Sequence, residues 1–212
     1  MEHRALSEAK WILGVLGLAW LATVFVVPLL SIVFALMLLG TVYFFRDPDR
    51  SPPPGENVAV APADGVVTTV DEVEEGEFFK VPMKRVGIFL SVLDVHVNRV
   101  PIAGEVMHSE PKPGKFLDAR DPSSSLWNVS RSWVFTGPAG SVLVRQITGA
   151  IARRICAWAV VGDRLARGER FGMIRFGSRT ELLVAVESEI LVRVGDRVRG
   201  GETAVARLPD VT

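Results

Sequence analysis

Hydrophobic and charged positions divide the chain into two unlike parts. An uncharged run of 35 residues extends from Trp11 to Phe45, and Pro28 divides it into two halves of 17 residues. As one helix the run would be roughly 50 Å long. The hydrocarbon core of a bilayer is about 30 Å thick, and each half would be about 25 Å long. We therefore expect residues 1–45 to form a hydrophobic helical membrane segment. One tilted span, a helical hairpin and a re-entrant wedge all fit this pattern.

Basic residues flank this segment on both sides. Arg4 and Lys10 precede the uncharged run, and Arg46 and Arg50 follow it. Since basic residues favour the cytoplasmic side of a membrane, the pattern favours a hairpin and places the rest of the chain on the cytoplasmic face of the cell membrane. A cleaved signal peptide does not fit, because the run is too long and no small-residue cleavage pattern follows it. A helix buried in a soluble domain is the alternative.

A proline-rich connector, residues 46–55, follows the segment. Proline lacks a backbone donor and favours extended geometry, so this stretch predicts a stiff linker. Residues 56–212 then show short alternating runs with many β-branched side chains, which predict strands. The predicted strands are Val58–Ala61, Gly65–Val70, Arg85–Val92, Gly104–His108, Ser132–Phe135 and Ser141–Ile147. Residues 148–159 fit either a short helix or a further strand.

An internal repeat lies in the C-terminal third of the chain. Residues 162–169 and 195–202 both begin with Gly-Asp and contain a second glycine. This pattern predicts a β-hairpin in each copy, and it resembles the β-sandwich hybrids of biotinyl and lipoyl carrier domains. Those carriers attach their cofactor to a lysine in an exposed turn, but no lysine follows Lys115. We therefore expect a mainly β domain of the β-sandwich or barrel-sandwich-hybrid type that is not a swinging-arm carrier.

Composition excludes several classes of protein. The formal net charge is zero, so bulk attraction to nucleic acid is not expected. Cys156 is the only cysteine, which excludes an intramolecular disulfide and a Cys-rich metal site. The three histidines, His3, His96 and His108, are too scattered to suggest a zinc site. We therefore predict neither a bound metal nor a nucleic-acid partner.

One Gly-Ser pair interrupts an apolar strand pattern at Gly177 and Ser178. A glycine in such a position often marks a β-bulge. The carbonyl of a glycine is also the least hindered one that a following serine hydroxyl can attack. Such an attack would convert the amide to an ester, and elimination would then cut the chain and leave a pyruvoyl group. The pair at Gly140 and Ser141 fits an ordinary turn.

Two further stretches carry polar groups that could assist this chemistry. Asp64 precedes a glycine, which fits either an ordinary turn or a carboxylate that orients a neighbouring base. Asp94, His96 and Asn98 alternate with valines, which predicts a strand with three polar residues on one face. Burying three such groups is costly without a purpose. Because an imidazole titrates near neutral pH, His96 is the candidate general acid or base; a purely structural histidine is the alternative.

Four stretches together resemble one enzyme family. They are Phe44–Pro48, Pro62–Gly65, Asp94–Pro101 and Phe171–Arg179. In this order, over nearly the whole chain, they resemble the short (archaeal-type) form of the phosphatidylserine decarboxylase family, which depends on a pyruvoyl group. The resemblance implies a carboxy-lyase of phospholipid biosynthesis that converts phosphatidylserine to phosphatidylethanolamine and carbon dioxide.

The resemblance also implies autocatalytic cleavage of a zymogen. The proenzyme would cut itself between Gly177 and Ser178 into a β chain, residues 1–177, and an α chain, residues 178–212, which stay together as a heterodimer. The pyruvoyl group made from Ser178 would form a Schiff base with phosphatidylserine and accept electrons as PLP does elsewhere, without metal or PLP. A diacyl substrate rarely leaves the bilayer, so the site would lie at the lipid surface.

The resemblance assigns roles to individual residues. Asp64 matches the family's maturation aspartate, and His96 matches a histidine close to the reacting centre. Longer members carry a second histidine three residues later, where this chain has Arg99, which stays protonated and cannot act as a base. Either His96 serves maturation together with Asp64, or another group or water does. Arg99, whose fork suits carboxylates and phosphates, and Asn98 are candidate substrate-binding residues.

Two other functions fit parts of the same pattern. The paired repeat suits a non-catalytic, membrane-anchored β-sandwich adaptor that binds a protein partner. Within enzymes, a decarboxylase of another amino-headgroup lipid would need the same reactive serine. The sequence leaves the oligomeric state open, and a homo-oligomer is compatible with it.

Overall fold

The computed structural model describes residues 4–121, 123–150, 153–175 and 177–210. It divides the chain into two compact units, Met1–Asp49 and Arg50–Thr212. The first unit is helical and the second is mainly β, as the hydrophobic pattern predicted.

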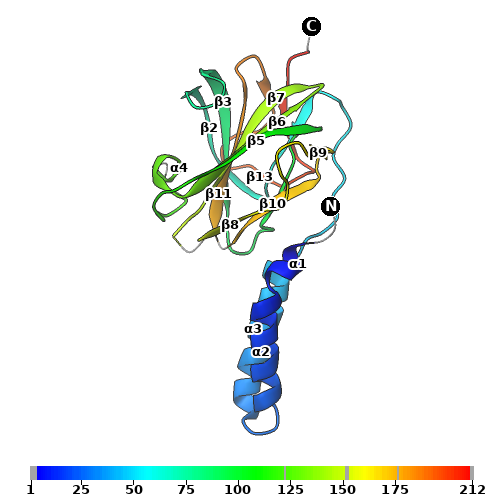
Figure 1. The fold of residues 1–212 in the computed structure, drawn as a ribbon, viewed down its shortest axis with the longest axis vertical. Coiled ribbons are helices and arrows are strands. Elements are labelled where there is room, and N and C mark those ends of the chain that lie inside the picture. Colours follow the sequence, from blue (N-terminus) through cyan, green and yellow to red (C-terminus); the bar gives the residue numbers. More distant parts are fainter. Residues whose placement is uncertain (1–3, 122, 151–152, 176, 211–212) are drawn as a thin grey trace. The chain divides into compact units, whose positions relative to one another are not determined.

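The N-terminal unit is built on a helical hairpin. After the short helix α1 (Ala5–Glu8), helices α2 (Lys10–Thr23) and α3 (Pro28–Phe44) lie side by side (Figure 1). Pro28 begins α3, a position that proline favours because its missing N–H is not needed there. Of the three arrangements that the sequence left open, this is the hairpin. Within the described residues, no helix combines the length and apolar character needed to cross a membrane.

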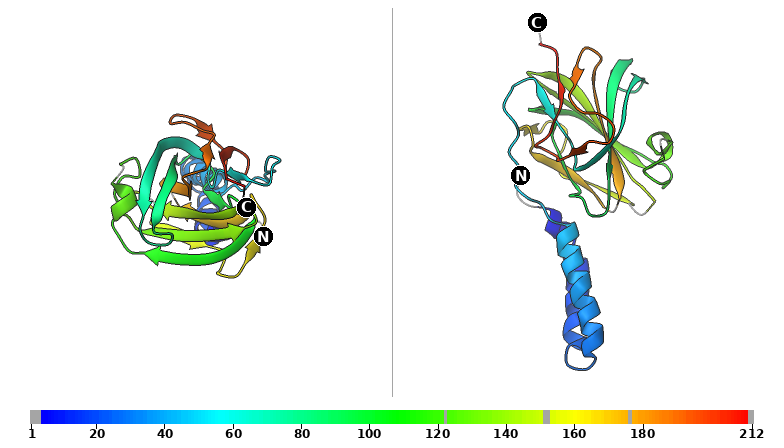
Figure 2. Two further views of the ribbon diagram at one scale, coloured as in Figure 1. Left: turned by 90° about the horizontal axis from the view of Figure 1, so that it is seen from above. Right: turned by 180° about the vertical axis from the view of Figure 1, so that it is seen from behind.

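The second unit is organised around a curled sheet of eight antiparallel strands (Figures 1 and 2). In spatial order its strands are β13 (Arg197–Val198), β2 (Gly65–Glu75), β3 (Val81–Leu90), β11 (Ser178–Ala185), β7 (Gly140–Ile147), β6 (Ser130–Gly137), β5 (Gly104–Lys112) and β9 (Arg164–Leu165). A short helix, α4 (Ser124–Trp127), lies in the connection between β5 and β6.

Two smaller sheets complete the unit. One has the order β4 (Val97–Arg99), β10 (Arg170–Arg175) and β8 (Arg154–Ala157), and the other β1 (Val58–Val60), β14 (Ala204–Arg207) and β12 (Glu189–Ile190). The aromatic rings of Trp133, Phe135 and Phe171 pack against one another and link β6 of the large sheet to β10. All three side chains are fully buried, so they form a large part of the core between these sheets.

All six predicted strands are confirmed, and most are longer than their alternating cores indicated. In the stretch over residues 148–159, the described part forms the strand β8 rather than a helix. The predicted strand face of Asp94, His96 and Asn98 is wrong in its extent. Strand β4 begins only at Val97; Asp94 lies in a bend and His96 in the irregular segment that leads into the strand.

The predicted hairpins of the repeat are also wrong. In each copy the short first strand joins one edge of the large sheet, β9 on β5 and β13 on β2. The second strand of each copy belongs to a different small sheet. Gly168 and Gly201, at φ +80° and +79°, turn the chain from one sheet to the other, a conformation that only glycine adopts without strain. The repeat therefore supplies the two edge strands of the large sheet, and the hairpin module on which the adaptor hypothesis rested does not form.

Candidate active site

Gly177 and Ser178 lie where the chain passes from a small sheet into the large one. Strand β10 ends at Arg175, and β11 begins at Ser178 between β3 and β7. Gly177 has φ +60°, in the left-handed region that disfavours residues with a Cβ. The pair is therefore a switch point between two sheets rather than a bulge within one strand.

The hydroxyl of Ser178 is buried without a hydrogen bond. The residue is fully buried, and its Oγ has no partner among the described residues. An unsatisfied buried hydroxyl costs about 1–3 kcal/mol, so such groups in native folds call for an explanation. Because no bond holds this Oγ elsewhere, it is free to turn towards the preceding carbonyl.

His96 contacts the residue next to this serine. Its Nε2 accepts a hydrogen bond from the Gly177 N–H at 3.2 Å, and its Nδ1 lies 2.9 Å from the carbonyl oxygen of Asp94. A carbonyl can only accept, so these two bonds assign the proton to Nδ1 and the lone pair to Nε2. The imidazole is fully buried and points its basic nitrogen at the peptide segment that contains Ser178.

The carbonyl of Gly177 lies against the backbone of Gly149. A Cβ placed on Gly149 would come within 2.5 Å of the Gly177 carbonyl oxygen. Asn128 holds this region in place: its side chain accepts a bond from the Leu117 N–H and donates to the carbonyls of Leu117 and Thr148, each at 2.8 Å. Sequence reasoning missed Asn128 and Gly149, because a lone asparagine or glycine in a connection is typical of any turn.

Asp64 belongs to a neighbouring group of charges. Its carboxylate accepts hydrogen bonds from the Gly200 N–H at 2.8 Å and from Arg50 at 3.0 Å. Burial raises the pKa of Asp64, the Gly200 N–H and Arg50 oppose that rise, and the negative charge of Asp94 adds to it. Asp94 therefore connects the two predicted site residues, since its carbonyl binds His96 and its charge acts on Asp64.

Asn98 and Arg99 are buried on β4 with partners inside the protein. The amide of Asn98 accepts a bond from Gln146 at 2.6 Å and donates to the Pro62 carbonyl at 3.3 Å. Arg99 donates to the carbonyl of Gly168 at 2.9 Å. The structure thus places both side chains in the interior beside the site, and a contact of either with substrate stays a prediction.

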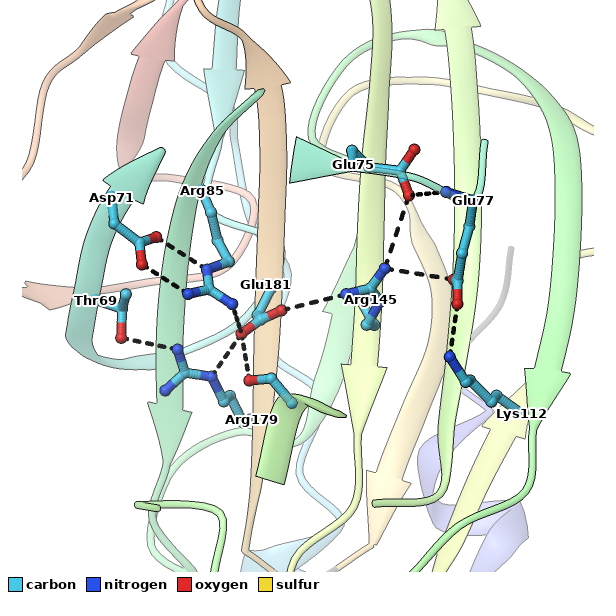
Figure 3. Close-up of polar contacts among 10 residues, drawn as sticks. Thr69, Asp71, Glu75, Glu77, Arg85, Lys112, Arg145, Arg179 and Glu181 are labelled. Atoms are coloured by element: carbon cyan, nitrogen blue, oxygen red, sulfur yellow. Dashed lines mark hydrogen bonds and ion pairs between the residues drawn. The ribbon is translucent and has the colours of Figure 1, made fainter. Parts of the chain in front are cut away.

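A charged network lies on the opposite face of β11 (Figure 3). The fully buried Glu181 binds Arg179 at 2.9 Å and the Ser125 hydroxyl at 2.6 Å, and Arg85 and Arg145 lie within 3.4 and 3.9 Å. Alternate residues of a strand face opposite sides of the sheet. The network therefore contacts the face of β11 that carries Arg179 and Glu181, and Ser178 lies on the opposite face. Sequence reasoning did not identify it. Among the described residues no group of three or more His, Cys, Asp or Glu side chains is placed to hold a metal ion.

Comparison with known proteins gives one consistent result. A family model described as phosphatidylserine decarboxylase matches residues 38–206. A phosphatidylserine decarboxylase proenzyme of Symbiobacterium thermophilum is 45% identical over 212 residues, which cover 99% of this chain and 98% of the relative. Proenzymes of the same name from Geobacter metallireducens and Gluconacetobacter diazotrophicus are 42% and 48% identical, over 85% and 79% of this chain and 83% and 76% of the relatives.

Proposed function

The chain belongs to the phosphatidylserine decarboxylase family, and we propose that it is a self-processing member whose reactive group is made from Ser178. Membership makes the chain a phosphatidylserine decarboxylase. The relatives are named proenzymes, which supports a precursor that is cut to become active.

The observation that carries the proposal is the arrangement at the Gly177–Ser178 peptide. The unbonded Ser178 hydroxyl adjoins a glycine carbonyl, and the Nε2 lone pair of His96 lies 3.2 Å from the Gly177 nitrogen. In the first step His96 Nε2 exchanges its bond from the Gly177 N–H for one from the Ser178 hydroxyl and takes the hydroxyl proton, while Oγ attacks the Gly177 carbonyl carbon. The peptide C–N bond then breaks, the Ser178 nitrogen receives the proton, and the amide has become an ester.

The second step cuts the chain. Removal of the Cα proton of Ser178 expels the carboxylate of Gly177 by breaking the bond between Cβ and Oγ. Residue 178 is left as dehydroalanine, and water then replaces its nitrogen, which leaves as ammonia. The raised pKa of Asp64 suits a carboxyl group that holds a proton during maturation, and we keep Asp64 and His96 together in that role.

The surroundings of Ser178 suit a pyruvoyl group. The group needs no coordinating side chains, and the Ser178 Oγ that it would replace makes no hydrogen bond that would be lost. When formed, it supplies Schiff-base chemistry, because its carbonyl condenses with an amine and takes up the electrons left by departing carbon dioxide. His96, with Nδ1–H fixed by the Asp94 carbonyl, would hold or move a proton at Nε2 beside it.

Cleavage at this bond would leave the two chains interlocked. The chain 178–212 contributes β11 between β3 and β7, β13 on β2, and β14 on β1. The strands β1, β2, β3 and β7 all lie in residues 1–177, so the hydrogen bonds of these pairings would hold the heterodimer together.

The helical hairpin suits a membrane-associated segment. Large apolar side chains on it are exposed, among them Leu18, Phe25 and Leu29, and an exposed apolar surface of this kind in one helical pair indicates a lipid or protein contact. Together with the flanking basic residues, it supports a location at the cell membrane with residues 56–212 on the cytoplasmic side.

Intact mass measurement tests the proposal. The purified protein and its Ser178→Ala variant are compared, followed by decarboxylation assays on phosphatidylserine and other amino-headgroup lipids. We expect two chains from the wild type, with residue 178 as pyruvoyl, and one uncut chain from the variant. A wild type that decarboxylates phosphatidylserine as a single 212-residue chain would contradict the proposal.

A further inference from the structure

The connection between β5 and β6 turns one side to the interior and another to solvent. Ala119 and Asn128 of this connection are buried. Phe116, Leu126 and Trp127 are instead 40%, 71% and 57% exposed. Exposed single apolar residues are ordinary, but three large ones in one connection make a surface that indicates a binding partner.

Two basic side chains lie over the exposed rings. The Nζ of Lys115 is 5.4 Å from the ring centre of Trp127, and the guanidinium of Arg153 is 5.6 Å from that of Phe116. Lys115 also bonds the Trp127 carbonyl through its backbone N–H, which holds the two segments together. We call Lys115, Phe116, Leu126, Trp127 and Arg153 the β5–β6 patch.

Four of the five patch residues belong to the connection that touches the cleavage site, and Arg153 comes from the connection between β7 and β8. The Cβ of Ala119 is 3.2 Å from the point where a Cβ of Gly149 would lie, and the Gly177 carbonyl oxygen is 2.5 Å from that point. Asn128, next to Trp127, bonds both Leu117 and Thr148. The connection that carries most of the patch therefore also packs against the carbonyl of Gly177.

We propose that the β5–β6 patch binds the anionic surface of a phospholipid bilayer and brings the reactive centre against the headgroup layer. Aromatic rings suit the membrane interface, and basic side chains are attracted to anionic lipids. Phosphatidylserine is itself anionic, so a bilayer that offers the substrate also offers the complementary charge. This inference rests on the proposed function, since it assumes that the substrate is presented at Ser178 from the bilayer.

The test compares one lipid headgroup in two physical states. The full chain and its Leu126→Ser/Trp127→Ser variant are assayed on long-chain phosphatidylserine in phosphatidylcholine vesicles and on monomeric dihexanoyl phosphatidylserine. Removing two interfacial side chains is expected to lower activity on vesicles roughly tenfold and to leave activity on the monomeric lipid unchanged. Val81→Ser is the control, because Val81 is exposed at the end of β3 remote from Leu90, the partner of Ser178, and it should change neither activity.

A second measurement reports contact with lipid directly. Fluorescence quenching by acyl-brominated lipids is compared between the wild type and Trp127→Phe, and the wild type should show an additional quenched component. An equal loss of activity on both substrates, no loss on vesicles, or identical quenching would overturn the proposal and leave the patch to a protein partner. Failure of the wild type to mature or to act on the monomeric lipid would instead contradict the proposed function.

Discussion

The Nε2 of His96 accepts a hydrogen bond from the backbone N–H of Gly177, the residue immediately before Ser178. The other ring nitrogen is fixed by the Asp94 carbonyl, so the basic nitrogen has one orientation. This contact joins two stretches that are 81 residues apart in the chain, and it places the candidate base beside the bond that we propose is cut.

Removal of this base should slow maturation. His96→Ala is expected to lower the rate of cleavage by roughly a hundredfold or more, because a positioned general base contributes about that much. Intact mass spectrometry at intervals after synthesis measures the fraction cut. His108→Ala is the matched control, since His108 is only partly buried and its Nε2 pairs with Glu110 at the surface. Cleavage of His96→Ala at the control's rate would exclude His96 as the base.

Gly149 should affect the rate of cleavage because there is no room for a larger side chain beside the Gly177 carbonyl. Because its Cβ would lie 2.5 Å from the Gly177 carbonyl oxygen, Gly149→Ala must displace the carbonyl that Ser178 attacks. We expect a folded protein that is cut at least tenfold more slowly, in line with the sensitivity of such reactions to displacements of about 1 Å. Gly76→Ala is the control, since nothing lies within 4 Å of its Cβ position. Circular dichroism checks the fold, and normal processing of Gly149→Ala would contradict this role.

The charged network behind β11 should stabilise the fold. Glu181→Gln would leave three arginines without their shared buried carboxylate, and breaking such a pair costs about 3–5 kcal/mol. Urea unfolding in the Ser178→Ala background, where the chain stays intact, measures this loss. Lys112→Gln breaks an exposed pair with Glu77 and should cost less than about 1 kcal/mol. Equal effects of the two substitutions would show that the network contributes little.

The lowered pKa of Glu75 predicts that the free energy of unfolding decreases at acid pH. Burial opposes its ionisation, but the N–H groups of Phe79, Phe78 and Glu77 outweigh burial and lower its pKa. A pKa that is lower in the folded state gives stability that is present above the unfolded value of 4.5 and is lost as the pH falls through the folded value. Glu75→Gln should therefore reduce the free energy of unfolding at pH 7 and flatten its decrease below about pH 5.

The acid prediction is measured by urea unfolding between pH 3 and pH 7, again in the Ser178→Ala background. Parallel pH profiles for the parent and for Glu75→Gln would show that the Glu75 carboxylate makes no net contribution. A larger difference between them at pH 7 than at pH 3 is the expected result.

The sequence was sufficient to predict those strands in which apolar and polar side chains alternate. Six strands were predicted because β-branched residues recur at every second position, and all six are present. The C-terminal end of β2 was not predicted, because Glu72 and Glu74 are exposed there and the sequence shows no alternation of apolar and polar residues. The repeat was misinterpreted because a Gly-Asp turn looks the same whether its strands pair with each other or with distant partners.

The candidate site was predictable only in part. Ser178 and His96 were identified from local patterns and from the family resemblance, and the structure brings the histidine to the residue before the serine. Asn128 and Gly149 act through contacts between connections that are distant in sequence, and no periodicity encodes such contacts. Arg179 and Glu181 were overlooked because charged residues on a strand are usually exposed, whereas here both are buried.

The central position of β11 has a consequence for how the molecule folds. The strand lies between β3 and β7 in the middle of the large sheet, rather than at an edge. The precursor forms this sheet within a single chain, so its folding is independent of protein concentration. After cleavage, a denatured molecule would have to recover a separate 35-residue peptide from solution and insert it between two strands. We therefore expect the cleaved enzyme to refold poorly once its two chains have separated. Its lifetime would then depend on its rate of unfolding rather than on an equilibrium stability.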